Sequence, residues 1–379
     1  MARTTKKDLE EIEKEISENK SSAVNPDILR AIKTAKMSLK KKFGDDLFSE
    51  KKVEKMPSVS TGSALLDKEI GNDGWVLGRV HEIFGGPSAG KSTVVSMTCA
   101  NAMRQYPDKY VIYLDYEQAM NFEYAKKLGL DVEDDRFIFL QPTSAEEGFE
   151  TIHRLVETGG ISTVIIDSVP AMMTQQELEK GYDEMTMGAK AKFLSTSIPK
   201  LIELIKRTQT AIIFVNQVRD TLGYSGSGQT TPGGKAIPFY SSTRIEIKRT
   251  QILTEKDVAY GQTVKFYVRK NKVGRPFGAF ESDLIFGKGF DYVSETIEIA
   301  IDLGIISKAG AWLKIKHGDK DELVLQGRNC AADYYRVNEE EFLDLKQRVS
   351  QFEDSADLTN NLDEATAIVV GEEHDDEGY

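Results

Sequence analysis

The stretch from Gly85 to Thr93 constrains the fold of this chain more than any other feature. It matches the pattern GxxxxGK[ST], and it stands between an apolar run that ends at Phe84 and a helix-forming run that begins near Val94. Such a loop lets successive backbone N–H groups wrap around phosphate oxygens, and the N-terminus of the following helix adds positive potential. The sequence therefore predicts a phosphate-binding α/β domain, with the phosphate loop made of Gly85, Gly86, Pro87, Ser88, Ala89, Gly90, Lys91, Ser92 and Thr93.

Short apolar runs of strand length recur on both sides of this loop, separated by segments with helical spacing. They are Val80 to Phe84, Tyr110 to Leu114, Thr163 to Ile166 and Ala211 to Val215. Strands without clean alternation, separated by helices, are typical of a doubly wound parallel sheet covered on both faces. Two later runs, Thr243 to Lys248 and Val264 to Arg269, do alternate and are joined by a charged link. They predict an antiparallel extension of the sheet.

A phosphate site of this kind also needs a cation, a metal shell and a base. In such a loop Lys91 bridges the outer phosphates and the Ser92 hydroxyl ligates Mg²⁺. Asp167 ends the third run in the form of a Walker B carboxylate, which holds the magnesium shell. Glu117 lies just beyond the acidic end of the second run, where a carboxylate can deprotonate an attacking water; an ordinary surface glutamate is the alternative. We therefore expect Ser92 and Asp167 to be the metal-binding pair.

Two glycine-containing segments stand out as candidate binding loops. Thr221 to Ala236 holds five glycines without apolar periodicity, and long loops of this kind inside a compact domain are usually functional or disordered. It follows Gln217, which closes the fourth run at a strand tip where it can sense a γ-phosphate. A polymer bound by this loop could thus be coupled to hydrolysis, whereas a mobile solvent loop is the alternative. Gly181 to Lys192 is a second candidate, although by itself it looks like an ordinary helix entry.

The charge of the chain is unevenly distributed. Glu353 to Tyr379 contains ten acidic residues and no Lys or Arg, so the 49 Lys and Arg elsewhere face 51 acids and residues 1–352 carry a net charge of only −2. The tail is expected to be a disordered, solvated appendage, acting either as a solubilising segment or as an internal competitor for a basic groove.

The sequence divides into five expected segments. They are an extension at 1–25, a helix and linker at 26–56, the ATPase core at 57–288, a small α+β domain at 289–352 and the acidic tail at 353–379. The helix should begin near Pro26 and be stopped by Gly44, and its apolar stripe must pack on its own domain or on a neighbouring subunit. Cys99 and Cys330 lie far apart, which argues against a disulfide framework and a cysteine-rich metal site. Because no apolar run approaches a membrane span and the first 20 residues are charged, we expect a cytoplasmic protein without membrane partners.

Taken in order, these motifs resemble those of RecA-type homologous recombinases, in a bacteriophage or divergent bacterial form. The resemblance runs from about Pro26 through the small C-terminal domain. Its motifs are Ser60-Thr61-Gly62-Ser63, Leu66-Asp67, Gly78-Arg79-Val80, Leu114-Asp115-Tyr116-Glu117, Tyr124-Ala125-Lys126-Lys127-Leu128-Gly129, Ile166-Asp167-Ser168-Val169, Asn216-Gln217-Val218-Arg219, Thr230 to Ala236 with Phe239-Tyr240, Lys270-Asn271-Lys272 and Lys308-Ala309-Gly310-Ala311-Trp312. The resemblance implies a RecA-like ATPase core.

The resemblance also implies roles for particular residues around the nucleotide. It makes Glu117 the catalytic carboxylate, Gln217 the γ-phosphate sensor and Tyr124 the stacking partner of adenine, so ATP with Mg²⁺ is the expected cofactor. It makes Lys270 and Lys272 a pair that reaches the γ-phosphate of an adjacent subunit, so the complete site would exist only in a filament.

For DNA, the resemblance implies a first loop containing Met187 and Gly188 and a second loop that begins after Gln217. The expected DNA-binding residues are Met187, Gly188, Lys192, Arg219, Gly233, Gly234, Lys235, Arg244, Lys248 and Lys265. Departures from the family pattern are Asn121, in place of an Asp that bonds adenine, and Pro199 and Pro238, in place of basic residues of the DNA groove. The acidic tail is also a family feature, associated with restrained uptake of duplex DNA.

The expected function is therefore that of an ATP-dependent DNA recombinase and DNA-dependent ATPase. It would polymerise on single-stranded DNA, pair that strand with homologous double-stranded DNA and exchange strands, in contact with single-strand-binding and loader proteins. Two alternatives stay open from the residues alone. One is a ring-forming DNA helicase or remodelling ATPase on the same fold, and the other is a non-catalytic filament scaffold that binds ATP as a structural ligand.

Overall fold

A computed structural model describes residues 26–44, 55–180, 188–221, 228–316 and 322–352 of the chain. The chain divides into two compact units, Met1–Lys55 and Met56–Tyr379. In the first unit, helix α2 (Pro26–Phe43) carries Asp27 in its first turn and three lysines in its last, charges that favour the two ends of the helix dipole. Gly44 follows with φ of 94° and donates its N–H to the Lys40 carbonyl oxygen, which ends the helix where the sequence predicts.

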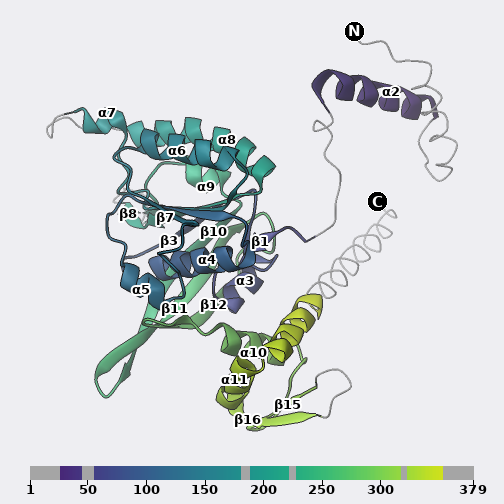
Figure 1. The fold of residues 1–379 in the computed structure, drawn as a ribbon, viewed down its shortest axis with the longest axis vertical. Coiled ribbons are helices and arrows are strands. Elements are labelled where there is room, and N and C mark those ends of the chain that lie inside the picture. The colour runs from purple at the N-terminus through teal and green to yellow at the C-terminus, as the bar shows by residue number, and fades with distance from the viewer. Residues whose placement is uncertain (1–25, 45–54, 181–187, 222–227, 317–321, 353–379) are drawn as a thin grey trace, which may run out of the picture. The chain divides into compact units, whose positions relative to one another are not determined.

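The second unit is built on a nine-stranded sheet (Figure 1). Its strand order is β13-β12-β11-β10-β3-β7-β6-β4-β5. The parallel part consists of β3 (Val80–Gly85), β7 (Ala211–Gln217), β6 (Ile161–Asp167), β4 (Tyr110–Asp115) and β5 (Phe137–Leu140), and β10 (Thr243–Glu255) continues it alongside β3. All four parallel strands predicted from the sequence are present, and apart from exposed Tyr110 they are largely buried on both faces, with Glu82 and Asn216 as buried polar residues among the apolar ones.

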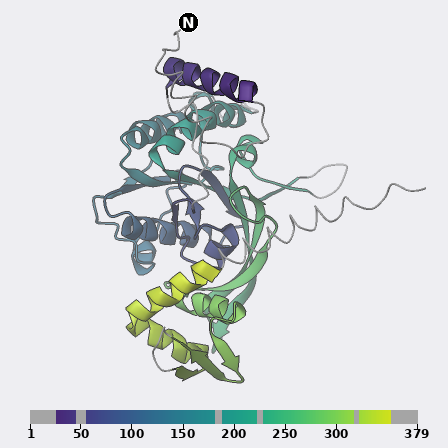
Figure 2. The same cartoon turned by 90° about the vertical axis from the view of Figure 1, so that its right-hand side faces the viewer.

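Helices cover both faces of this sheet, as Figures 1 and 2 show. One face packs against α3 (Ala64–Ile70), α4 (Lys91–Gln105) and α5 (Phe122–Lys127). The other face packs against α6 (Ala145–Glu157), α8 (Ala189–Thr208) and α9 (Ala236–Tyr240). Consecutive residues of a strand point to opposite faces, so Ile165 belongs to the first core and Ile166 to the second. The doubly wound architecture expected from the sequence is thereby confirmed.

The antiparallel extension is longer than the sequence predicts. β10 and β11 (Val258–Asn271) pair from Thr243 opposite Asn271 to Glu255 opposite Val258, so the segment expected to be a charged link is itself two strands. The reversal takes place at Lys256 and Asp257, which both have positive φ, and these charged residues do not carry the usual Asn-Gly hairpin signature. β12 (Ala279–Ile285) and β13 (Gly289–Phe290) complete the sheet, which thus runs two residues past position 288.

Past β13 the chain builds a smaller layer on a core of its own. It contains α10 (Tyr292–Asp302), a three-stranded sheet of β14 (Ser307–Ala309), β15 (Trp312–Ile315) and β16 (Leu323–Gln326), α11 (Gly327–Val337) and a helical segment at 339–352. Ala64 and Leu65 of α3 pack into this core, and α10 contacts α3. The small layer is therefore joined to the helix-covered face that carries α4.

Two short strand pairs and one short helix complete the description. β1 (Ser58–Val59) pairs with β2 (Trp75–Val76). Helix α7 (Gln175–Leu178) begins with a capping box, in which Thr174 is the N-cap. β8 (Arg219–Thr221) pairs with β9 (Gly228–Thr230) at the base of the glycine-rich loop. Within the described residues, no helix is long and apolar enough to span a membrane. The acidic tail, the N-terminal extension and Met187 lie outside the described residues.

Candidate nucleotide site and adjoining loops

The phosphate loop lies where the sequence predicts, between the end of β3 at Gly85 and the start of α4 at Lys91. Gly90 caps the helix with φ of 105°, and a Cβ there would come within 2.6 Å of Leu284 Cδ1. A Cβ on Gly85 would come within 2.1 Å of the Ile247 carbonyl oxygen. Position 90 therefore requires glycine for its backbone angle, and position 85 requires it for space beside a backbone carbonyl group.

A pocket of about 180 Å³ opens beside the loop. Its lining residues are Ser88, Ala89, Gly90, Lys91, Ser92, Thr93, Tyr124, Gln262, Leu284 and Phe286. Tyr124 is placed by α5, and its hydroxyl lies 3.0 Å from Thr93 Oγ1, so the predicted stacking residue does lie at the loop. Gln262 donates to the Ser88 carbonyl oxygen at 3.1 Å. An aromatic ring, apolar side chains and a few polar groups around a phosphate loop suit a nucleoside triphosphate.

Three residues of this pocket, Gln262, Leu284 and Phe286, were missed by sequence reasoning. They come from β11, β12 and the turn after β12, far along the chain from the phosphate loop. Only the pairing of Gln262 with Leu284, and the strand order that puts β11 beyond β10, bring them to the loop. The one available signal is that alternation along β12 continues to Phe286, which is exposed although it is large and apolar.

Lys91 points back at its own loop, where Nζ donates to the carbonyl oxygens of Gly86 at 2.7 Å and Gly85 at 3.1 Å. Desolvation by burial lowers the pKa of Lys91, while Asp167 and Glu117 act in the opposite direction. Burial raises the pKa of Asp167 to about 6, against the hydrogen bond that it accepts from the Tyr113 hydroxyl at 2.6 Å. A bound divalent cation would favour the charged carboxylate again.

The donor set near the loop fits magnesium. Ser92 exposes its hydroxyl at the first turn of α4, and Asp167 supplies a carboxylate at the end of β6. Mg²⁺ prefers such oxygen ligands, and it commonly takes only one or two from the protein while phosphates and water supply the others. These two residues would hold the ion, which would neutralise charge on the outer phosphates.

The ends of three adjacent parallel strands meet at Glu117. Its Oε1 accepts hydrogen bonds from Ser168 Oγ, just after β6, and from Gln217 Nε2 at 3.1 Å, at the end of β7. The turn that carries Glu117 is itself fixed by buried Asp115, which accepts from the N–H groups of Ala119 at 3.0 Å and Met120 at 3.1 Å. The structure thus brings the predicted base and the predicted sensor into direct contact, at the carboxyl ends of the strands.

The glycines and exposed cations predicted to contact DNA lie around the same strand ends. Gly188 caps α8 with φ of 83°. Gly233 has φ of 94°, and a Cβ added to it would lie only 2.9 Å from Val169 Cγ1. Gly234 also has a positive φ. The side chains of Lys192, Arg219 and Lys235 are exposed.

Other predicted cations are already paired within the chain. Arg244 Nε bonds the buried Glu82 carboxylate at 2.5 Å, Lys248 lies 2.9 Å from Glu246, and Lys265 lies 3.8 Å from Glu281. Lys270 Nζ donates to the carbonyl oxygens of Pro238 at 2.7 Å and Phe239 at 2.8 Å, whereas Lys272 is exposed.

Comparison with known proteins gives one consistent family. The family model of the RecA N-terminal domain matches residues 30–291 of this chain. The chain is 34% identical to Protein RecA of Desulforapulum autotrophicum over 326 residues, which cover 85% of this chain and 92% of that protein. It is 35% identical to Protein RecA of Lactobacillus acidophilus (85% and 86% covered) and 34% identical to that of Chloroherpeton thalassium (89% and 94% covered). The crystal structure of the RadB recombinase superposes with a TM-score of 0.46 at 18% identity, over 61% of this chain and 97% of that chain, a likeness too remote to assign any residue.

Proposed function

This chain belongs to the RecA family of ATP-dependent recombinases, and we propose that it works as a helical filament on single-stranded DNA that pairs this strand with homologous duplex and exchanges strands. It is a DNA-dependent ATPase. The family relationship does not favour the two alternatives, a ring-forming helicase and a non-catalytic scaffold. Homology would be read by base pairing, while the protein holds the backbone through its loops.

One observation supports this proposal most directly. Glu117 contacts both Ser168 at the end of the metal-binding strand and Gln217, which begins the segment leading into the glycine-rich loop. A γ-phosphate placed against Lys91 would meet the base and the sensor together. Loss of the γ-phosphate would therefore change the position of Gln217 and of the loop that follows it. ATP-controlled binding of DNA requires such a link between the nucleotide and the loop.

The proposal includes finer assignments. Mg²⁺ would be held by Ser92 and Asp167, adenine would stack on Tyr124, and Asn121 would change base selectivity. Asn121 Oδ1 accepts from the Tyr124 N–H at 2.9 Å, so its side chain serves as the N-cap of α5. Single-strand-binding and loader proteins would be partners, the acidic tail would restrain duplex uptake, and the protein would act in the cytoplasm.

The decisive experiment measures ATP hydrolysis with and without single-stranded DNA across a salt series. We expect DNA to stimulate turnover, and DNA affinity to fall with salt at a slope of about −0.7 per phosphate contacted. Lys91→Ala should abolish both hydrolysis and ATP-driven strand exchange, because the cation that bridges the outer phosphates is lost. Unchanged strand exchange by this variant would refute the assignment, and electron microscopy with ATP and DNA should show helical filaments rather than closed rings.

A further inference from the structure

Glu82 is a carboxylate buried in the centre of the sheet. It lies on β3, the strand that runs into the phosphate loop, and its exposed fraction is 0%. β3 is flanked by β10 and β7, so Glu82 stands opposite Arg244 on one side and Phe214 on the other. Removing a carboxylate from water is costly unless charge-assisted hydrogen bonds replace the lost hydration. The partners of Glu82 therefore explain how this position tolerates a charge.

Each oxygen of Glu82 holds a different strand. Oε2 accepts from Arg244 Nε on β10 at 2.5 Å, and Oε1 accepts from Asn216 Nδ2 on β7 at 2.9 Å. Asn216 is itself fully buried. The carboxylate is thus a bridge between the two neighbours of the strand that feeds the phosphate loop.

The side chain of Asn216 makes two further hydrogen bonds. Its Nδ2 also donates to the Pro232 carbonyl oxygen at 3.0 Å, at the returning end of the glycine-rich loop. Its Oδ1 accepts from the backbone N–H of Gln217, whose side chain reaches Glu117. One amide side chain therefore touches both the backbone of the proposed γ-phosphate sensor and the end of the proposed DNA loop.

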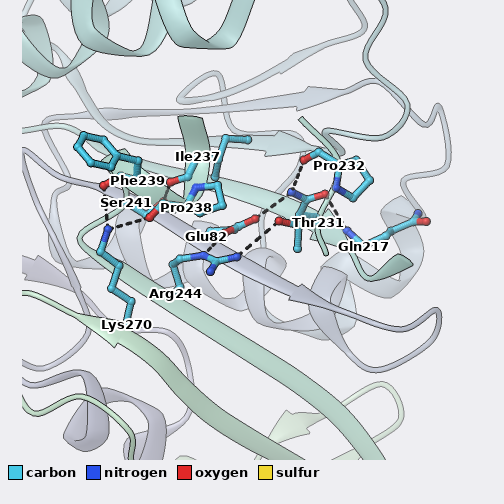
Figure 3. Close-up of polar contacts among 11 residues, drawn as sticks. Glu82, Gln217, Thr231, Pro232, Ile237, Pro238, Phe239, Ser241, Arg244 and Lys270 are labelled. Carbon is cyan, nitrogen blue, oxygen red and sulfur yellow. Dashed lines mark hydrogen bonds and ion pairs between the residues drawn. The ribbon is translucent and has the colours of Figure 1, made fainter. Parts of the chain in front are cut away.

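Arg244 reaches the same loop end from the opposite strand, as Figure 3 shows. Its Nη2 lies 3.5 Å from Thr231 Oγ1, and the central carbon of its guanidinium lies 4.7 Å from the centre of the Phe84 ring. Arg244 thus contacts Thr231 and Asn216 contacts Pro232, and both of these side chains are hydrogen-bonded to the Glu82 carboxylate. The side chain of Arg244 is 19% exposed, so it is committed to this interior contact.

The segment that follows Pro232 is fixed at its far end as well. It continues into α9, and the last carbonyl groups of that helix, at Pro238 and Phe239, accept hydrogen bonds from Lys270 Nζ (Figure 3). Lys270 pairs with Arg244 across β10 and β11. Residues 231–240 are therefore tied to the sheet at both ends, at one end through Glu82 and at the other through Lys270.

We propose that Glu82 is a positioning residue that couples the γ-phosphate end of the nucleotide site to the glycine-rich loop. It contacts neither nucleotide nor DNA. By fixing Asn216 and Arg244, it makes a displacement of Gln217 move Thr231 and Pro232 with it, so the phosphate state and the loop change together. This inference rests on the proposed function, because it takes Gln217 as the sensor and the loop as the DNA contact. A hydrogen-bonded unit with few alternative arrangements transmits such a change better than a loose one.

The test compares Glu82→Gln with the wild-type chain. Glutamine keeps the shape but loses the charge, and its amide nitrogen cannot accept from one of the two donors. The matched control is Glu295→Gln, a second buried carboxylate, which lies on α10 away from the loops. Two readouts are needed: the KM and kcat for ATP with and without single-stranded DNA, and hydrogen exchange of residues 230–240 with and without a slowly hydrolysed ATP analogue.

For Glu82→Gln we expect the KM without DNA to stay within about twofold of wild type while DNA stimulation of kcat falls by about tenfold or more, the size of a typical allosteric coupling. Nucleotide-dependent exchange at residues 230–240 should also disappear, and Glu295→Gln should retain both responses. Stimulation within twofold of wild type, or a loss of turnover in equal proportion with and without DNA, would show that Glu82 is only structural.

Two results would require a further measurement: a Glu82→Gln variant that does not fold, and a wild-type chain that does not respond to DNA. If Glu82→Gln gives no cooperative melting transition, Asn216→Ala decides, because it cuts the link to Pro232 while leaving the Glu82–Arg244 ion pair in place; undiminished stimulation in that variant overturns the proposal. If the wild-type chain shows no response to DNA, the proposed function fails. The exchange readout, which uses nucleotide alone, still confirms or refutes the coupling.

Discussion

The Glu117 carboxylate accepts hydrogen bonds from side chains at the ends of two neighbouring strands. Both donors, Ser168 and Gln217, are neutral, so they orient the carboxylate without neutralising it. A general base must be ionised and held at a defined angle to the water that it activates. The contacts of Glu117 with Ser168 and Gln217 supply the fixed orientation.

Replacing Glu117 with Gln is expected to separate binding from hydrolysis. Glutamine can keep contacts to Ser168 and Gln217 but cannot take a proton from water. DNA-stimulated turnover should fall by about a hundredfold or more, the usual contribution of a general base, while the affinity for ATP changes little. The measurement is steady-state ATP hydrolysis together with equilibrium binding of a fluorescent ATP analogue.

Glu123→Gln is the matched control for this prediction. Glu123 is exposed in the first turn of α5, a few residues beyond Glu117. Its replacement should leave turnover within about twofold, since surface substitutions usually have small effects. Turnover above a tenth of the wild-type rate in Glu117→Gln would remove Glu117 from the role of base.

Candidate residues that follow strands in chain order could be predicted from the sequence, and the structure places four of them close together: Lys91, Asp167, Glu117 and Gln217. Glu82 could not be predicted in this way. A single acidic residue within an apolar strand signals that a partner is needed, but period-two patterning does not say which distant strand supplies it. The partners Asn216 and Arg244 become neighbours only through the sheet order.

At the scale of elements, two buried carboxylates mark the junction of α3 and α10. Asp67 on α3 accepts from Ser60 Oγ at 2.5 Å and from the Thr61 N–H at 2.7 Å. Glu295 on α10 accepts from Ser282 Oγ and from the Leu65 N–H, so it ties the small C-terminal layer to α3. Desolvation by burial dominates over these hydrogen bonds and raises the pKa of each carboxyl to about 7.

The raised pKa of Glu295 predicts a pH dependence of stability. In the folded chain Glu295 keeps its proton up to about pH 7. In the unfolded chain, where its pKa has the ordinary value of 4.5, it loses the proton at lower pH. The folded state therefore binds more protons between these values, and its stability decreases as the pH rises through this window. Glu295→Gln resembles the protonated acid and cannot ionise. Its Tm should accordingly rise relative to wild type as the pH is taken from 5 to 8.

Thermal unfolding of both proteins at matched pH values measures this difference. Glu298→Gln provides the control, since Glu298 lies on the same helix but is partly exposed and pairs with Arg328 at 3.0 Å. Its Tm difference from wild type should not vary across the same window. A pH-independent difference for Glu295→Gln as well would mean that this carboxyl is already ionised in the folded chain.

The elements themselves were predictable to different degrees. The parallel strands were found because each is a buried apolar run bounded by helical spacing, and α2 was found because it is strongly amphipathic and ends at Gly44. β5 was not found, since four residues beside a loop give too short a pattern. The long hairpin of β10 and β11 was cut short because the outer halves of its strands are exposed and polar, so they carry no apolar alternation.

At the scale of the whole molecule, the site formed by one chain lacks a cation beyond Lys91 among the residues that line the described pocket. Lys270 and Lys272 lie on and just after β11, and Lys270 Nζ is directed at the carbonyl groups of α9 in its own chain. Desolvation, together with repulsion from Lys272 and Arg244, lowers the pKa of Lys270. The role of the two lysines at the nucleotide of a neighbouring chain stays a prediction from the sequence, and the single cation lining the described pocket is its motivation.

Replacing both lysines with alanine should therefore reduce DNA-stimulated hydrolysis by about tenfold or more, as the loss of charged groups that stabilise a phosphoryl transition state does, with ATP binding by single chains nearly unchanged. Lys272→Ala alone is the cleaner variant, because Lys270 also holds the end of α9. The measurement is turnover with saturating single-stranded DNA beside binding of the fluorescent ATP analogue. Full activity in the double variant would exclude the interface role.

Mixing two impaired variants gives the sharpest form of this prediction. A Lys272→Ala chain keeps its own Glu117, and a Glu117→Gln chain keeps its own Lys272, so an active interface forms wherever the first contributes the pocket and the second the lysine. Random assembly of equal amounts in a head-to-tail filament would place about a quarter of the interfaces in this arrangement. The mixture should thus reach about a quarter of wild-type turnover, above the residual turnover of either variant alone. If Lys272 served the nucleotide of its own chain, no interface would contain an intact set and the mixture would stay at the mean of the two residual rates.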